Sequence, residues 1–182
     1  PYHAWRYDAN GQVDEIPNLP GPCPKSAKLH SYPVQEVLGA VMMWHDTEFG
    51  EPDFAPPALV EWDDPRWVNG TYDHLGVIPI HSQELLDNMA DSNHFGPVHG
   101  VPPDYFSNEF RDHLYVQYQG GFRLEYNAYL RTSTFYTGPG LLISRQQIGE
   151  IHSIEFIFHT PLDDGSVKVW HNVVMRTDTD TP

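Results

Sequence analysis

Five segments with the residue pattern of β-strands fill the C-terminal part of the chain, and they constrain its fold more than any other feature. These segments are residues 109–119, 122–131, 140–147, 150–160 and 166–176. Gly120-Gly121 and Asp164-Gly165 are turn signals between neighbouring segments. Consecutive strands that are joined by short turns pair in antiparallel fashion. The sequence therefore predicts an antiparallel sheet over this region.

One helix is predicted ahead of these strands, over residues 82–94. Ser82 is a suitable N-cap residue, and apolar residues recur at helical spacing after it. Gly96-Pro97 is expected to end this helix, because proline cannot continue a helical hydrogen-bond pattern. A helix that precedes an antiparallel sheet indicates an α+β fold class.

The first third of the chain has a different character. Residues 16–33 contain five prolines, so we expect them to run extended rather than form a helix or a central strand. Residues 34–44 form an apolar run that suits a buried strand, with a turn at Gly39-Ala40. Residues 46–66 mix prolines with acidic residues and are expected to link two folded parts.

The charge balance excludes several classes of protein. The 182 residues include 10 Lys+Arg and 25 Asp+Glu, which gives a formal net charge of -15. No basic patch is available to neutralise phosphates, so nucleic acid is not expected as a partner. No run of about 18 apolar residues occurs, so we expect no transmembrane segment and a cytoplasmic location. The single Cys excludes a disulfide framework, whereas eleven His leave a histidine-based metal site open.

Polar side chains are concentrated near the end of the predicted helix. Asp91 and His94 are three residues apart, so a helix would place them on one face. His99 follows after the Gly-Pro break, which would let both imidazoles converge. Two neutral imidazoles and a carboxylate form the facial triad of non-haem Fe(II) oxygenases. A metal-free cluster on a helix surface is the alternative, and the absence of His-Glu-x-x-His disfavours a zinc hydrolase.

The chain opens with Pro1-Tyr2-His3-Ala4-Trp5, and a hairpin is predicted over residues 4–14 with Asn10-Gly11 at its turn. Because the first residue is not Met, we expect the chain to be a piece of a longer protein. A Cys immediately before Pro1 would complete the sequence Cys-x-x-His, as in one ligand loop of a Rieske [2Fe–2S] centre. His3 would then stand where the second His ligand belongs.

Together these stretches resemble the Rieske non-haem iron oxygenases, specifically their oxygenase (terminal) component. Residues 88–99, with the pattern Asn-x-x-Asp-x-x-His-x4-His, are similar to the family's mononuclear-iron motif in residue type and spacing. Residues 34–46 resemble the closing strands of the family's Rieske domain. Residues 102–106 (Pro-Pro-Asp-Tyr-Phe) resemble the branch that contains the bacterial 3-ketosteroid 9α-hydroxylases and the cholesterol 7-desaturases.

The resemblance implies a role for each matching residue. His94 and His99 would bind the mononuclear Fe(II), and His3 would bind the [2Fe–2S] cluster. Asp91 would link the cluster of a neighbouring subunit to this iron, and Asn88 would line the iron site. Residues that would line an apolar substrate pocket, with ordinary core packing as the competing expectation, are Phe95, Val98, Tyr105 and Phe106.

The resemblance also implies an activity and an architecture. The oxygenase would use O2, with electrons from NAD(P)H that arrive through a reductase and possibly a ferredoxin, to hydroxylate or desaturate a bulky apolar, possibly steroid-like substrate. The full-length protein would be a homotrimer. Residues 1–46 would be the C-terminal part of an all-β Rieske domain, and residues 47–66 a linker. Residues 67–182 would be a truncated helix-grip catalytic domain, with an antiparallel sheet that grips helices.

Some family ligands have no counterpart in this sequence. The third iron ligand of the family is an Asp on a helix after the sheet, which we expect beyond Pro182. Asp178 and Asp180 are weak candidates, because they lie in a Thr/Asp run of the kind that is usually solvated. Cys23 has no His at the required offset, so the cluster cysteines are expected upstream of Pro1. The chain alone is therefore expected to be inactive.

Three alternatives remain open at this point. A non-catalytic ligand-binding module could use the same helix-grip sheet without iron, and convergence of Asp91, His94 and His99 would argue against it. A Rieske oxygenase could instead act on aromatic rings or as an O- or N-demethylase. A pure Rieske electron carrier is disfavoured, because it would lack the iron motif in residues 88–99.

Overall fold

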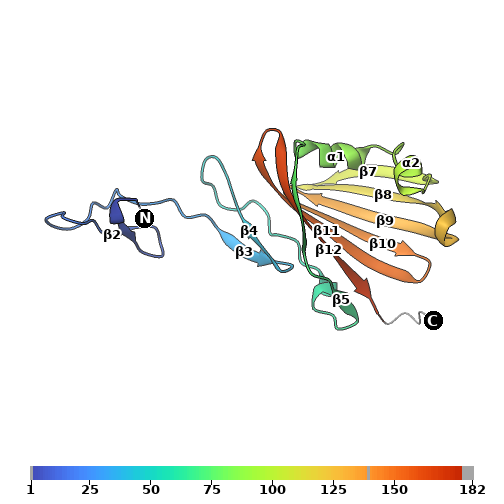
Figure 1. The fold of residues 1–182 in the computed structure, drawn as a ribbon, viewed down its shortest axis with the longest axis horizontal. Coiled ribbons are helices and arrows are strands. Elements are labelled where there is room, and N and C mark those ends of the chain that lie inside the picture. The colour runs from blue at the N-terminus through green and yellow to red at the C-terminus, as the bar shows by residue number, and fades with distance from the viewer. Residues whose placement is uncertain (1, 139, 178–182) are drawn as a thin grey trace. The chain divides into compact units, whose positions relative to one another are not determined.

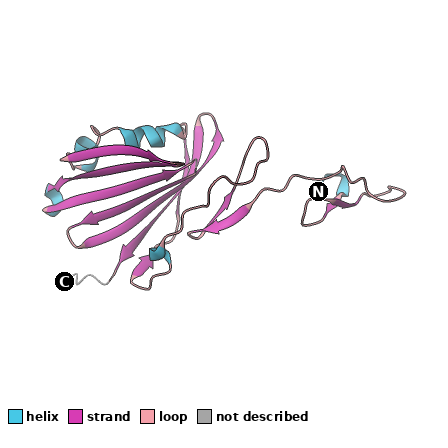
Figure 2. Ribbon diagram, turned by 180° about the vertical axis from the view of Figure 1, so that it is seen from behind, coloured by secondary structure: helices cyan, strands magenta, loops and turns pink. Residues whose placement is uncertain are grey.

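The computed structural model describes residues 2–138 and 140–177, which form two compact units. The first unit is Pro1–Ala55 and the second is Pro56–Pro182 (Figure 1). Most of the regular structure lies in the second unit, where strands dominate and helices are few (Figure 2).

The first unit is built around two small antiparallel hairpins. Its elements are η1 (Tyr2–Ala4), β1 (Arg6–Tyr7), β2 (Val13–Glu15), β3 (Val34–Val37) and β4 (Ala40–Met43). β1 pairs with β2, so the predicted hairpin over residues 4–14 is confirmed, and β3 pairs with β4. Residues 16–33 contain no helix or strand beyond an isolated bridge between Gln12 and Lys28, as the prolines predicted.

Residues 34–44 are a hairpin, and the prediction of a buried strand is wrong for most of them. The turn lies at Leu38-Gly39, one position earlier than predicted, and both residues have positive φ. This conformation is typical of a two-residue hairpin turn. Val37 is 4% exposed, whereas Val41 is 77% exposed. The apolar run is therefore buried in this unit only around its turn.

The second unit is an eight-stranded antiparallel sheet with two helices on one face. The strand order is β5-β12-β11-β10-β9-β8-β7, with β6 also paired to β12. Its short elements are η2 (Val60–Trp62), β5 (Trp67–Asn69), β6 (Asp73–Ile78), α1 (Gln83–Ala90), α2 (Phe95–His99) and η3 (Leu124–Tyr126). Its long strands are β7 (Tyr105–Arg111), β8 (Leu114–Arg123), β9 (Ala128–Thr137), β10 (Leu141–Ile148), β11 (Ile151–Asp163) and β12 (Ser166–Arg176).

The predicted antiparallel sheet is confirmed, but several boundaries differ. β12 matches the predicted segment 166–176, whereas the predicted segment 109–119 spans the turn between β7 and β8. Gly120-Gly121 is not a turn, because both glycines lie inside β8. A Cβ on Gly120 would overlap the ring of Tyr105, and one on Gly121 would overlap the carbonyl oxygen of Pro102. These glycines therefore serve close packing on the two faces of the strand.

The predicted helix is shorter than expected, and a second one follows it. α1 ends at Ala90, and Asp91 is extended with φ -88 and ψ 109. α2 contains Gly96-Pro97, which the sequence had suggested as a helix end. Pro97 is the third residue of α2, where a backbone N–H would have no partner within the helix. A proline in the first turn is therefore compatible with this helix.

Apolar side chains pack on both faces of the sheet. On the helix face, α1 contributes Met89 to a buried cluster, and Leu85, Leu86 and Ile157 pack against it. The cluster consists of Met89, Tyr115, Tyr136 and Leu142. On the opposite face, the ring of Trp62 in η2 packs edge-on against Phe156, with centroids 6.0 Å apart. Cross-strand partners share a face, so these contacts identify the two sides of every strand.

Candidate metal centre

The junction between α1 and α2 carries the polar residues that the sequence singled out. The Asp91 backbone N–H still donates to the Asp87 carbonyl at 3.1 Å, and the chain then leaves the helix. The Asn93 N–H donates to Asp91 Oδ1 at 2.8 Å, which closes a tight turn. His94 immediately precedes α2, and His99 is its last residue. Both histidines are therefore held by the same short helix.

The two imidazoles lie next to each other. The ring centroids of His94 and His99 are 5.1 Å apart, and the ring planes meet at 70°. The Phe95 ring packs beside both, at 4.3 Å from His94 and 5.5 Å from His99. A metal ion about 2.1 Å from one nitrogen of each ring is compatible with this separation. The structure thus brings together the two histidines that the sequence predicts as iron ligands.

His94 presents one nitrogen in the form that a metal requires. Its Nδ1 is 2.7 Å from the Asp91 carbonyl oxygen. A carbonyl only accepts hydrogen bonds, so Nδ1 carries the proton and the lone pair is on Nε2. Nε2 is buried and has no hydrogen-bond partner among the described residues. A buried acceptor without a partner is costly, and coordination to a metal would satisfy it.

The surroundings of His99 favour its neutral form. Burial lowers the pKa of His99 below 6.5, and the neighbouring His94 lowers it further. Arg123 acts in the same direction, and the Glu155 carboxylate opposes them. Only the neutral imidazole binds a metal, so this environment favours the ligand form near neutral pH.

Asp91 lies on the Nδ1 side of His94. Its Oδ2 is 3.7 Å from His94 Nδ1, away from the nitrogen that carries the lone pair. The facial triad suggested by spacing alone is therefore wrong for Asp91, because Asp91 is extended rather than helical. Among residues 2–138 and 140–177, no group of three or more His, Cys, Asp and Glu could hold a metal. Asp178 and Asp180 lie outside the described residues.

The other predicted site residues fall in several places. Asn88 is exposed on α1, and Val98 is 68% exposed on α2. Phe95 is buried and packs on Phe106 with ring centroids 5.9 Å apart, beside the histidine pair. Tyr105 lies against Gly120, on the face of the sheet opposite α1 and α2. The structure thus places Phe95 at the imidazoles and Phe106 against Phe95, whereas Tyr105 lies elsewhere.

His3 and Cys23 belong to the first unit, whereas the histidine pair belongs to the second. His3 lies in η1 with a left-handed backbone (φ 51, ψ 26) and an exposed side chain. Cys23 is a free cysteine. The role of His3 as a cluster ligand stays a prediction.

Polar residues line the sheet face beneath the helices, and the sequence reasoning missed them. Thr134 and Ser144 share a buried hydrogen bond of 2.9 Å between their hydroxyls. Glu155 interacts with His171 Nε2 at 2.8 Å and accepts from Gln146 Nε2 at 2.9 Å. The missed signal is polar residues at alternate positions of otherwise apolar strands, since period two marks one sheet face.

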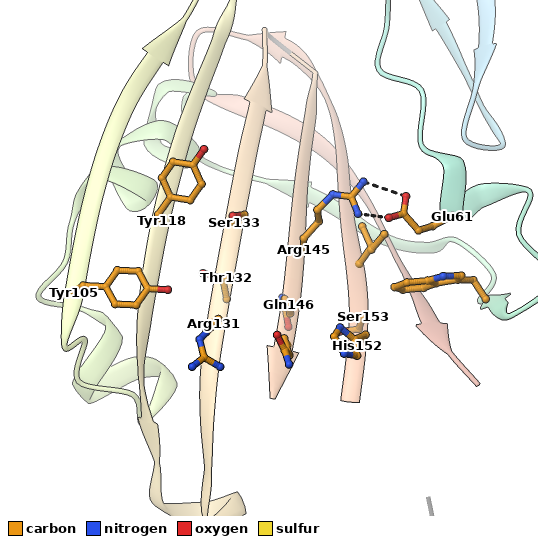
Figure 3. A pocket seen from close by; sticks show the side chains of 13 residues that line it. Glu61, Tyr105, Tyr118, Arg131, Thr132, Ser133, Arg145, Gln146, His152 and Ser153 are labelled. Carbon is orange, nitrogen blue, oxygen red and sulfur yellow. Dashed lines mark hydrogen bonds and ion pairs between the residues drawn. The ribbon is translucent and has the colours of Figure 1, made fainter. Parts of the chain in front are cut away.

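The opposite face of the sheet carries a groove of about 580 Å³. Tyr105, Tyr118, Arg131 and Arg145 line it, and both carboxylate oxygens of Glu61 pair with the Arg145 guanidinium (Figure 3). This ion pair lowers the pKa of Glu61. Because the groove opens on the side away from α1 and α2, we do not assign it to the metal centre.

Comparison with known proteins defines the class. The fold is that of the catalytic domain in a Rieske oxygenase terminal component. Within that class, the family model described as "3-Ketosteroid 9alpha-hydroxylase C-terminal domain" matches residues 43–182, and the chain belongs to this family. Among the described residues, no helix has the length and apolar character needed to cross a membrane.

Individual relatives agree with the family. The chain is 31% identical to a probable 3-ketosteroid-9-alpha-monooxygenase oxygenase component of Rhodococcus rhodochrous, over 100% of this chain and 50% of the relative. It is 30% identical to a cholesterol 7-desaturase of Caenorhabditis elegans, over 57% of this chain and 24% of that protein. The matched region thus spans about half the length of the first relative and a smaller share of the second.

Solved structures with low sequence identity share the fold. A dicamba monooxygenase with non-heme iron and dicamba matches with a TM-score of 0.72 at 18% identity, over 100% of this chain and 59% of that one. A Pseudomonas putida NdmA variant with caffeine matches with a TM-score of 0.75 at 18% identity, over 100% of this chain and 55% of that one.

Proposed function

We propose that the protein containing this chain is the oxygenase component of a Rieske-type oxygenase that hydroxylates or desaturates a bulky apolar, steroid-like substrate. O2 would be the oxidant, and a reductase, with or without a ferredoxin, would deliver electrons from NAD(P)H. The observation that carries this proposal is the buried Nε2 of His94, which has no hydrogen-bond partner in the part of the chain that the structure describes. It lies beside His99, in a chain that the steroid-hydroxylase family model matches.

His94 and His99 would hold the mononuclear Fe(II), and His3 would be one ligand of the [2Fe–2S] cluster. The remaining ligands of both centres would come from outside the described residues. When bound, the two iron centres supply the one-electron and O2 chemistry that protein side chains lack. We further propose that residues 1–46 close a Rieske domain, that residues 47–66 link it, and that residues 67–182 belong to the catalytic domain.

The chain's own residues prepare the site. The Asp91 carbonyl keeps the proton of His94 on Nδ1, so that Nε2 can bind metal. Phe95 packs beside the imidazoles, with Phe106 behind it, and the two rings would exclude water from that side. Asn88 and Val98 would contribute at the exposed rim of the same site.

Asp91 is proposed to connect two subunits. Its side chain is 49% exposed while its backbone holds His94. The exposed Asp91 carboxylate would accept a hydrogen bond from a cluster histidine of a neighbouring subunit. The same residue orients His94 through its backbone carbonyl. This role requires a homo-oligomer, and we propose the homotrimer that the family resemblance implies.

The steroid-like substrate is supported by the names of the relatives. These are oxygenase components of 3-ketosteroid-9-alpha-monooxygenases and a cholesterol 7-desaturase. Both names describe oxidation of large, apolar ring systems, whereas the structural matches with other substrates support the fold alone.

The test uses the full-length protein and its His94→Ala and His99→Ala variants. We expect each variant to lose its mononuclear iron while the visible spectrum of the [2Fe–2S] cluster stays unchanged. Turnover of a 3-ketosteroid, measured with NADH and a cognate reductase, should fall at least about 100-fold. The reason is that the chemistry supplied by the mononuclear iron would be lost. His152→Ala, on the groove face of the sheet, is the matched control. Full iron content in either His94 or His99 variant would refute the proposal.

A further inference from the structure

We infer that Gln117 is a positioning residue for the metal centre, because its side-chain amide determines where α1 ends and therefore where Asp91 and His94 lie. Gln117 is on β8 and does not belong to the α1–α2 junction. The inference rests on the proposed function, in that it assigns Gln117 to the same metal site.

The contact that carries the inference is short and buried. Gln117 is 3% exposed, and its Nε2 donates to the Met89 carbonyl oxygen at 2.6 Å. Met89 lies in the last turn of α1 and is also buried, at 3% exposure. The bond connects the sheet to the helix terminus, across 28 residues of sequence.

The Met89 carbonyl needs this partner because α1 stops where it does. The last carbonyls of a helix have no N–H partner within the helix. If α1 continued, the Met89 carbonyl would accept from the N–H of Asn93. In the structure that N–H donates to Asp91 Oδ1 instead. Gln117 therefore satisfies a buried carbonyl that the end of the helix leaves open.

The consequence reaches the metal ligand through two residues of backbone. Because α1 ends at Ala90, Asp91 adopts an extended conformation. In that conformation its carbonyl oxygen is 2.7 Å from His94 Nδ1 and sets the tautomer of the ring. Without the amide of Gln117, one more helical turn would satisfy the Met89 carbonyl. That turn would rotate Asp91 and break its contact with His94.

A neighbouring pair of residues provides a matched control. Thr134 is the cross-strand partner of Gln117 and is likewise buried on the helix face of the sheet. Its hydroxyl bonds to Ser144 within the sheet, rather than to α1. Thr134→Val removes a buried hydrogen bond at the same depth without touching the helix terminus.

The experiment compares Gln117→Met and Thr134→Val in the full-length protein. Methionine has the length of glutamine but no N–H donor. After removal of the mononuclear iron, Fe(II) is titrated back while the cluster spectrum is monitored. We expect Gln117→Met to weaken Fe(II) binding by about 10–100-fold, as for other residues that orient a metal ligand. Thr134→Val should stay within about 2-fold of the wild type.

A second readout is independent of metal loading. Hydrogen–deuterium exchange over residues 90–94 of the metal-free protein should change in Gln117→Met and match the wild type in Thr134→Val. Equal Fe(II) affinity and equal exchange in both variants would overturn the inference. If Gln117→Met does not fold, Gln117→Asn replaces it, since its amide is one methylene too short to reach Met89.

The two proposals fail in different ways. A wild-type protein that binds no mononuclear Fe(II) would refute the proposed function. A wild-type protein that binds Fe(II), with Gln117→Met equal to Thr134→Val in both readouts, would refute only the role of Gln117.

Discussion

At the scale of single residues, Gly121 determines how closely the segment after His99 packs on the sheet. Gly121 has no Cβ at the point where the Pro102 carbonyl and the Val101 side chain lie over β8. Val101 itself is fully buried. The segment that follows His99 can approach β8 only because β8 carries no side chain at Gly121.

Gly121→Ala is therefore expected to destabilise the protein. Overpacking of this kind costs about 1–3 kcal/mol, because the backbone must move. Urea denaturation of the full-length protein measures the change in free energy of unfolding. Gly138→Ala is the control, since nothing lies within 4 Å of a Cβ at that position. Equal unfolding midpoints for the two variants would show that the close approach is unimportant.

The buried pair of His159 and Tyr136 is expected to make the stability of the protein depend on pH. Burial lowers the pKa of His159 below 6.5, and burial raises the pKa of its partner Tyr136 to about 12. The Tyr136 hydroxyl therefore stays protonated and bonds to His159 Nε2 at 2.9 Å. Above pH 6.5 the imidazole is neutral in the folded and unfolded states alike. Below pH 6.5, the imidazole of the unfolded state takes up a proton more readily than that of the folded state. The free energy of unfolding therefore decreases as the pH is lowered.

This titration contributes up to about 1.4 kcal/mol per pH unit, between pH 6.5 and the lowered pKa. His159→Gln should remove that contribution. The measurement is the free energy of unfolding of both proteins from pH 5 to 8, where the other histidines contribute equally to each. Parallel curves for wild type and variant would contradict the assignment.

At the scale of elements, Met89 is the most deeply buried side chain that α1 packs on the sheet. Met89 is 3% exposed and packs with Tyr115, Tyr136 and Leu142. Met89→Ala should cost about 2–5 kcal/mol, the usual range for truncation of a buried large side chain. Chemical denaturation gives the value, and Val98→Ala, at a 68% exposed position, should change it little. A Met89 variant as stable as the Val98 variant would disprove the packing role of α1.

The elements also show what sequence patterns can and cannot predict. Consecutive strand-like segments with short turns predicted the antiparallel sheet. β12 was placed correctly because Asp164-Gly165 is a true hairpin turn. Gly120-Gly121 was wrongly predicted to be a turn, because glycine serves close packing as well as turns. Pro97 misled in the same way, since proline is tolerated in a first helical turn as well as beyond a last one. Local patterns do not distinguish these cases, which depend on tertiary contacts.

The same limit applies to the site. The sequence predicted that His94 and His99 converge because the chain turns at Gly96-Pro97. The ring separation confirms that the two imidazoles lie close together. The predicted reason is wrong, because Gly96-Pro97 lies inside α2. The position of Asp91 could not be predicted, because the end of α1 depends on an amide from a distant strand. Glu155 and its polar neighbours were missed, since only the register of four strands places them on one face.

At the scale of the whole molecule, the chain consists of two units that meet in sequence within an exposed, acidic stretch. Residues 47–53 are all exposed, and they precede the boundary at Ala55. Backbone of this kind is where proteases cut folded proteins. Long paired strands such as β11 protect their peptide bonds.

A glutamate-specific protease should therefore cleave the native full-length protein after Glu48 before it cleaves after Glu155 in β11. Glu51 is a poor site, because Pro52 follows it. Mass spectrometry of the first fragments identifies the cut. Initial cleavage after Glu155 would contradict the two-unit organisation.

The hydrogen bond from His94 Nδ1 to the Asp91 carbonyl has a consequence for metal identity. A ring that is already oriented would need little rearrangement to accept a metal ion. Imidazole ligands bind Zn²⁺ and Cu²⁺ more tightly than Fe²⁺. Two imidazoles alone would therefore not select iron over these ions by affinity at the proposed site. Metallation of that site would depend on which ions are supplied during expression and purification, and trace zinc would be the contaminant to exclude.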